Sequence, residues 1–157
     1  MIKEKKELTA SQAKEKALRL LEFRSHSEQE LYRKLIMAGA KHEDLPPIME
    51  FLKQYNFLDD AQYAKRLARE LQNLKKYGKY RFIQELKSRG ISGEDLENAV
   101  LELDDNEADA LLPLVERKLK GDLERKNIDK TIRYFIYRGY RIEDIKNCIE
   151  QLKSDEY

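Results

Sequence analysis

The amino-acid sequence predicts an all-α fold made of three tandem three-helix repeats, which we expect to form an elongated, curved array. Glycines recur at Gly39, Gly90 and Gly139, which are 51 and 49 residues apart. Similar residue types surround each glycine at matching distances along the chain. The chain also has few β-branched runs and no alternation of apolar and polar residues, the patterns that predict strands. Internal repetition with helical spacing therefore decides the predicted fold class.

The residues around the three glycines agree in type at six positions. A large apolar residue stands four positions before each glycine, Glu and Asp stand four and five positions after it, and apolar residues follow at six, ten and thirteen. Unrelated segments rarely agree at so many positions, so we interpret the pattern as a true repeat. Its members are Leu35, Glu43, Asp44, Leu45, Met49 and Leu52; Leu86, Glu94, Asp95, Leu96, Val100 and Leu103; and Phe135, Glu143, Asp144, Ile145, Ile149 and Leu152.

Each copy predicts two helices joined at the glycine. Apolar residues before the glycine recur at helical spacing. The glycine can adopt the left-handed conformation that ends a helix without a Cβ clash. The Glu-Asp pair favours a new helix, because carboxylates stabilise free N–H groups and the positive end of the helix dipole. The later apolar positions share one helical face, which we expect to face a core.

A further helix is expected before each pair, over about residues 11–24, 58–71 and 106–119. Pro113 should kink the third of these helices or mark its true start. Ser27 and Glu30 form a capping-box pattern ahead of the next helix. We therefore divide the chain into a flexible tail and three repeats that are too small to be stable alone. Their ranges are 1–10, 11–57, 58–104 and 105–157.

The composition excludes several classes of protein. There are 31 Lys and Arg against 30 Asp and Glu, so a charged fraction of 39% leaves a formal net charge of only +1. Such a balanced chain is not driven to disorder by self-repulsion. The single cysteine excludes an internal disulfide and fits a reducing cytosol. No apolar run exceeds four residues, so we expect no membrane span and no secretory signal.

The sequence offers no set of residues that predicts catalysis. His26 and His42 lack a second ligand at metal-binding spacing, and we expect both to be exposed and without function. Cys148 occupies a position that is apolar in the other copies, so we expect it in the core. Asp59 and Asp60 precede an amphipathic stretch and are better interpreted as helix caps than as acid–base residues. We therefore predict no catalytic residue, no metal and no cofactor.

The strongest functional signal is the basic segment over residues 75–81, Lys-Lys-Tyr-Gly-Lys-Tyr-Arg. Cations interleaved with aromatic rings can neutralise phosphates and stack on bases. The alternative, a solvated loop whose tyrosines pack on neighbouring helices, remains open. A second basic stretch, from Arg117 to Arg141, is diluted by acidic residues and is interpreted for the most part as a solvated helical surface.

Three-helix repeats invite comparison with helix-turn-helix DNA readers, whose last helix enters the major groove. In this chain the last helix of each repeat begins with Glu and Asp, and that of the second repeat has no Lys or Arg. Phosphates lining a groove would repel such a surface. A base-reading repressor is therefore disfavoured, and any DNA contact should use the middle helices and the loops before them.

Four motifs occur in order between residues 12 and 152. They are Ala17-Leu18-x-Leu20-Leu21-x-x-Arg24-Ser25-x-Ser27-x-x-Glu30-Leu31-x-x-Lys34-Leu35; Phe57-Leu58-Asp59-Asp60-x-x-Tyr63-Ala64; Lys76-Tyr77-Gly78-x-x-Arg81-x-x-x-Glu85-Leu86-x-x-Arg89-Gly90-Ile91; and Arg138-Gly139-Tyr140. Together they resemble the RecX family, the modulators of the RecA recombinase. The third motif is the most specific of the four.

The resemblance implies a cytoplasmic, non-enzymatic protein that binds RecA and its nucleoprotein filament. It implies inhibition of the recombinase, ATPase and coprotease activities of RecA, and so a role in DNA recombination, DNA repair and the SOS response. We expect a monomer with no membrane association. The alternative is a helical module that contacts DNA directly, without base-specific readout. The residues we expect to contact the partner or nucleic acid are Lys75, Lys76, Tyr77, Lys79, Arg81 and Arg89.

Overall fold

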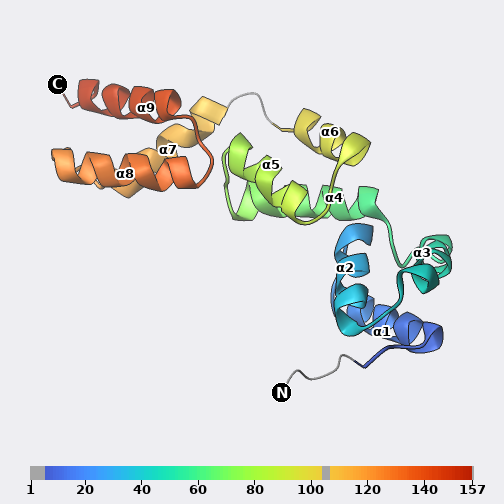
Figure 1. Cartoon of the computed structure of the whole chain (residues 1–157). Coiled ribbons are helices and arrows are strands. Elements are labelled where there is room, and N and C mark those ends of the chain that lie inside the picture. The colour runs from blue at the N-terminus through green and yellow to red at the C-terminus, as the bar shows by residue number, and fades with distance from the viewer. Residues whose placement is uncertain (1–5, 104–106, 157) are drawn as a thin grey trace, which may run out of the picture. The chain divides into compact units, whose positions relative to one another are not determined.

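The computed structural model describes residues 6–103 and 107–156, and every regular element within these ranges is helical (Figure 1). Residues 1–5 of the predicted tail lie outside the described residues. The prediction of an all-α fold of tandem three-helix units is confirmed. The helices are α1 (Ala10–Phe23), α2 (Glu28–Ala38), η1 (His42–Asp44), α3 (Leu45–Gln54), α4 (Asp60–Arg69), η2 (Glu70–Leu74), α5 (Lys79–Ser88), α6 (Gly93–Leu101), α7 (Glu107–Leu119), α8 (Arg125–Tyr137) and α9 (Ile142–Ser154).

The three repeated glycines have the predicted left-handed conformation. Their φ angles are 108° at Gly39, 82° at Gly90 and 99° at Gly139, and each glycine follows the middle helix of its triplet. The N–H of Gly39 donates to the last carbonyls of α2, as expected of a glycine cap. The capping box of Ser27 and Glu30 at the start of α2 is also confirmed.

The first and third triplets bury equivalent side chains, which confirms the repeat at the level of packing. α1 packs on α2 and α3, while α7 packs on α8 and α9. Leu35, Leu45, Ile48 and Met49 are buried in the first triplet. Their counterparts in the third are Phe135, Ile145, Cys148 and Ile149, all of them buried. Cys148 is therefore a core residue, as predicted, and burial raises the pKa of its thiol.

The chain forms two compact units that do not coincide with single triplets. The first unit comprises Met1–Leu67 and Leu86–Glu97, and the second comprises Ala68–Glu85 and Asn98–Tyr157. The middle triplet contributes residues to both units. Among the described residues, no helix has the length and apolar character needed to span a membrane.

The structure decides two local expectations. Pro113 lies inside α7, which begins at Glu107, close to the predicted start at residue 106, so the alternative that the proline marks the start of the helix is wrong. Glu43 and Asp44 form the short 3₁₀ helix η1 instead of the first turn of α3, which opens with Leu45 and has proline at its first positions. Proline is tolerated there because the first helical turn needs no N–H donors.

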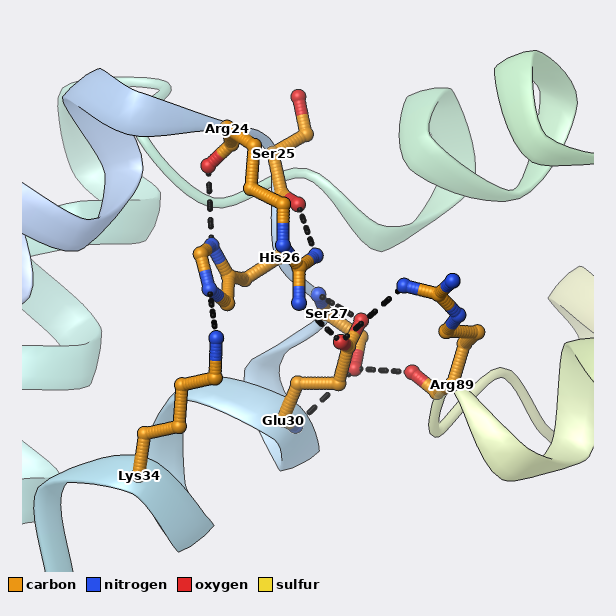
Figure 2. Close-up of polar contacts among 7 residues, drawn as sticks. All are labelled: Arg24, Ser25, His26, Ser27, Glu30, Lys34 and Arg89. Atoms are coloured by element: carbon orange, nitrogen blue, oxygen red, sulfur yellow. Dashed lines mark hydrogen bonds and ion pairs between the residues drawn. The ribbon is translucent and has the colours of Figure 1, made fainter.

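His26 is buried, with 2% of its surface exposed, so the expectation of an exposed histidine is wrong. Figure 2 shows the imidazole between the backbone of Arg24 and the side chain of Lys34. Nδ1 lies 2.9 Å from the carbonyl oxygen of Arg24, and Nε2 lies 2.9 Å from the Lys34 ammonium. A carbonyl only accepts and an ammonium only donates, so Nδ1 carries the proton and the ring is neutral. Burial lowers the pKa of His26, with neighbouring cations acting in the same direction.

Glu30 lies at the centre of the same polar cluster (Figure 2). Its carboxylate accepts a hydrogen bond from Arg24 at 2.9 Å and from the backbone N–H of Ser27 at 3.3 Å. Burial alone would raise the pKa of Glu30, but hydrogen bonds from Arg24 and Tyr63 outweigh it and lower the pKa. The cluster therefore holds a charged carboxylate in a half-buried setting, between the α1–α2 connection and Tyr63 of α4.

Candidate partner-binding surface

The basic segment predicted to contact a partner forms the connection between η2 and the first turn of α5. Its backbone is fixed by the α8–α9 connection of the same unit. Tyr140 donates its hydroxyl proton to the carbonyl oxygen of Lys76 at 2.7 Å. The N–H of Gly78 donates to the carbonyl of Arg138 at 2.8 Å, and the Arg138 guanidinium donates to the carbonyl of Lys75. These hydrogen bonds fix the backbone of the basic segment, so its lysine side chains project from defined positions.

Gly78 permits this arrangement because it has no side chain. A Cβ at Gly78 would come within 2.5 Å of the carbonyl carbon and oxygen of Gly139. Real Cβ atoms do not approach a backbone so closely, so the two chain segments can meet only at glycine. The glycine therefore serves the backbone geometry that places Lys76 and Lys79, rather than a contact of its own.

Lys75, Lys76 and Lys79 are exposed, as a binding role requires. None of the ion pairs formed within residues 6–103 and 107–156 involves these three lysines. The backbone N–H of Lys79 donates to the carboxylate of Glu107 at 2.6 Å, which fixes the start of α5 but leaves the side chain unused. Three ammonium groups are therefore available to an anionic partner.

Tyr77 and Arg81 are less available than the lysines. Both are half-buried, and the Tyr77 ring lies 5.0 Å from the Arg81 guanidinium and 4.9 Å from that of Arg138. Arg81 also forms an ion pair with Glu85 at 2.8 Å and lies 4.8 Å from the ring of Tyr137. Tyr77 thus packs within the unit, as the alternative for this segment proposed, whereas the second tyrosine of the segment, Tyr80, is 63% exposed.

Arg89 is held by another cluster and belongs to the other compact unit. Its carbonyl oxygen accepts a hydrogen bond from the Ser27 hydroxyl at 2.5 Å, and its guanidinium lies 4.0 Å from the Glu30 carboxylate (Figure 2). The structure thus brings five of the six predicted contact residues into one unit and places the sixth beside the half-buried Glu30.

A groove in the second unit adds residues that the sequence interpretation missed. It has a volume of about 630 Å³, and both the basic loop and the helices α7 and α8 contribute to its walls. The stretch from Arg117 onward, interpreted for the most part as a solvated surface, supplies most of its cations. A usable signal was the spacing of Lys130, Tyr134 and Arg138, which fall on one helical face at intervals of four.

In the described parts of the chain, no three His, Cys, Asp or Glu side chains gather as a potential metal site. The candidate site is a positively charged surface that can bind anionic groups. Its cations come from the loop before α5 and from α7 and α8.

Comparison with known proteins identifies the family. A model described as "RecX, first three-helix domain" matches residues 13–52, and one described as "RecX, second three-helix domain" matches residues 59–100. The chain belongs to the RecX family. The two matched domains correspond to the triplets α1–α3 and α4–α6.

Curated RecX relatives align over most of the chain. The regulatory protein RecX of Vibrio cholerae (strain M66-2) is 33% identical over 145 residues, which cover 91% of this chain and 95% of the relative. That of Vibrio campbellii is 32% identical over 139 residues, covering 87% and 89%. The crystal structure of RecX from Lactobacillus salivarius has a TM-score of 0.73 at 21% identity and covers 92% of this chain and 96% of that one. This structural likeness concerns the RecX fold, and the relatives are named as regulatory proteins.

Proposed function

We propose that this chain binds RecA and the RecA–DNA filament in the cytoplasm and inhibits the recombinase, ATPase and coprotease activities of RecA. It acts as a monomer, without a catalytic residue, metal or cofactor. In this way it regulates DNA recombination, DNA repair and the SOS response. The observation that carries this function is membership of the RecX family, with curated relatives aligned over nearly the whole chain.

The candidate surface is consistent with this role. A RecA–DNA filament presents both protein and phosphate, and an arrangement of exposed cations on a fixed backbone suits such a mixed partner. Lys75, Lys76 and Lys79 provide those cations. The acidic starts of α6 and α9, by contrast, are unsuited to contact with phosphate.

In the proposed mechanism the protein lies along the filament and bridges neighbouring RecA subunits. The curved array of three-helix units that the sequence predicts would suit the helical groove of a filament. Occupation of that groove competes with the contacts needed for strand exchange. The result is an inactive filament or faster filament disassembly.

A RecA ATPase assay on single-stranded DNA tests the proposal. Addition of this protein should lower the steady-state hydrolysis rate in a concentration-dependent manner. A protein lacking helical structure after heat treatment serves as the control. An unchanged rate at saturating protein, with no protein detected on pelleted filaments, would contradict the function.

The alternative is direct binding to DNA without base-specific readout, and the exposed lysines before α5 favour it as a second candidate. Titration of labelled single-stranded DNA with and without RecA separates the two. Filament regulation predicts binding that depends on RecA. The alternative predicts strong binding to DNA alone that weakens as salt is raised.

A further inference from the structure

The groove of the second unit, which we call the basic groove, combines a high positive charge with an apolar lining. Basic side chains dominate its walls and apolar side chains form much of the rest. The residues that line it are Leu74, Lys75, Lys76, Leu114, Arg117, Lys118, Leu119, Lys120, Asp122, Asn127, Lys130, Tyr134, Phe135 and Arg138. All of them belong to one compact unit, so the groove is a feature of that unit alone.

The charge of the basic groove is unbalanced. Seven of its lining residues are Lys or Arg and one, Asp122, is acidic. In the chain as a whole the two signs nearly cancel, with a net charge of +1. None of the seven cations forms an ion pair with a carboxylate of the described residues. Like charges crowded into a concave surface attract an anionic ligand and repel one another in its absence.

The apolar lining indicates that the ligand is more than a row of negative charges. Leu74 is 78% exposed at the groove, although a leucine gains about 1.5–3 kcal/mol on full burial. Leu114 is half-buried beside the covered Leu119 and Phe135. A ligand with a large apolar side chain can bury these surfaces, whereas a phosphate chain cannot.

The aromatic groups of the groove are poorly placed to stack on bases. The Tyr134 ring has the Lys118 ammonium 4.1 Å from its centre and the Arg138 guanidinium 5.5 Å from it. Both cations lie over the ring, where a base would otherwise stack. Asp122, the one acidic lining residue, accepts the backbone N–H of Glu124 at 3.0 Å, and its charge repels phosphate and carboxylate alike. The lining therefore favours an acidic polypeptide over single-stranded nucleic acid.

Hydrogen bonds within the unit fix the walls of the groove. The side-chain amide of Asn127 donates to the carbonyl oxygens of Leu119 at 3.1 Å and of Asp122 at 2.8 Å, which fixes the turn after α7. The Arg138 guanidinium donates to the carbonyl of Lys75, which joins the end of α8 to the segment before α5. A preformed groove binds with less loss of conformational entropy than a mobile one.

We propose that the basic groove binds an acidic segment of a partner protein, with an apolar side chain of that segment buried against Leu74 and Leu114. The cations on α7 and α8 neutralise the flanking carboxylates. Which protein supplies the segment depends on the function proposed above, but binding of a model peptide does not.

Fluorescence anisotropy with the full chain tests the proposal. The probe is a labelled short peptide of Asp and Glu surrounding one Leu and one Phe, compared with the same peptide carrying Ser at the two apolar positions. A labelled oligothymidylate of equal charge is the third probe. The Leu–Phe peptide should bind about tenfold or more tightly than the Ser peptide, as expected from burial of one large apolar side chain.

Two variants locate the binding. Leu74→Ser should weaken binding of the Leu–Phe peptide about tenfold and leave binding of the Ser peptide unchanged. Lys118→Glu with Lys130→Glu should abolish binding of both peptides, while the matched reversal of Lys126 and Lys146, exposed lysines outside the groove, should have little effect. Circular dichroism checks that all variants fold.

Three results overturn the proposal. The Leu–Phe peptide does not bind, or the variant with Lys118 and Lys130 reversed binds it as tightly as the wild type. The third is that the oligothymidylate binds more tightly than the Leu–Phe peptide and the same reversal removes this binding. The last result assigns the groove to nucleic acid. Because the assay contains no RecA, its failure is distinct from a failure of RecA inhibition.

Discussion

Gly78 and Gly139 lie with their backbones in direct contact, at a separation that admits no side chain between them. A Cβ at Gly78 would lie 2.5 Å from the Gly139 carbonyl carbon, and one at Gly139 would lie 2.3 Å from the backbone nitrogen of Arg81. The N–H of Gly78 also donates to the carbonyl of Arg138 at 2.8 Å. The basic segment over residues 75–81 is therefore held in position where two glycines, more than sixty residues apart in sequence, pack against each other.

Substitution of Gly78 by Ala should destabilise the protein. The added methyl group meets backbone atoms, which cannot move aside as a flexible side chain can, so we expect a loss of about 1–3 kcal/mol in the free energy of unfolding. Urea unfolding followed by circular dichroism measures this loss. A variant with wild-type stability would show that the close approach does not persist in solution.

The steric cost of a side chain at Gly139 can be measured separately from the cost of its positive φ. Gly139 has a φ of 99° and close neighbours, whereas Gly121 has a φ of 74° and open space around its Cα. Both Gly139→Ala and Gly121→Ala introduce a residue with a positive φ, at about 1–2 kcal/mol each. Only the first adds a steric clash, so Gly139→Ala should be clearly the less stable of the two in the same unfolding assay.

Ser27 should contribute more to stability than an ordinary helix cap. Its hydroxyl oxygen accepts from the N–H of Glu30 at 3.1 Å, and its hydroxyl proton is donated to the carbonyl of Arg89. Ser27 is fully buried, so Ser27→Ala leaves buried groups unpaired and should lower stability by about 2–3 kcal/mol. Thr9→Ala removes the exposed capping box of α1 and should have a smaller effect of about 1 kcal/mol. Equal losses in thermal unfolding would contradict this reasoning.

The buried neutral His26 should make stability depend on pH. Burial lowers the pKa of its imidazole below the ordinary value of 6.5, so the unfolded chain takes up a proton before the folded chain does. The stabilisation is complete above pH 6.5, decreases as the pH falls below it, and is lost once the pH passes the lowered pKa of the folded state. Urea unfolding at about pH 7.5 and about pH 5.5 should therefore give a smaller free energy at the lower pH.

The His26→Gln variant tests the origin of this pH dependence. It should be less stable than the wild type at about pH 7.5 but lose much less stability on acidification. His42→Gln, which removes the exposed second imidazole, should retain the wild-type dependence. A wild-type pH profile in His26→Gln would assign the effect to other groups.

The sequence predicted the features of the fold that depend on local structure. Gly39 and its counterparts end helices, and Ser27 with Glu30 starts one, because these preferences act within a few residues. The burial of Cys148 also followed, since its equivalents in the other copies are apolar. Such features need only the chain near them.

Features that depend on packing between distant segments escaped prediction. His26 stands in a short polar connection and looks exposed in sequence, but it is buried in the fold, where α2 supplies Lys34 to its ring. The basic groove combines Leu74 with residues up to Arg138, and no local pattern joins them. The sequence of each segment indicates which residues share a helical face, but predicting the groove also requires knowing which faces lie together in the fold.

Reversal of the charges on Lys76 and Lys79 should weaken binding to RecA filaments. Both ammonium groups are exposed, and the hydrogen bonds of these residues involve backbone atoms, so Lys76→Glu with Lys79→Glu removes attraction while helicity and stability stay unchanged. Loss of even one charge contact of about 1.4 kcal/mol weakens binding tenfold. The reversal of Lys126 and Lys146 makes the same change in net charge elsewhere in the same unit and should leave binding nearly intact. Co-sedimentation with filaments and RecA ATPase inhibition measure both pairs. Equal inhibition by the two variants would remove the loop from the binding surface, because overall charge alone would then account for the interaction.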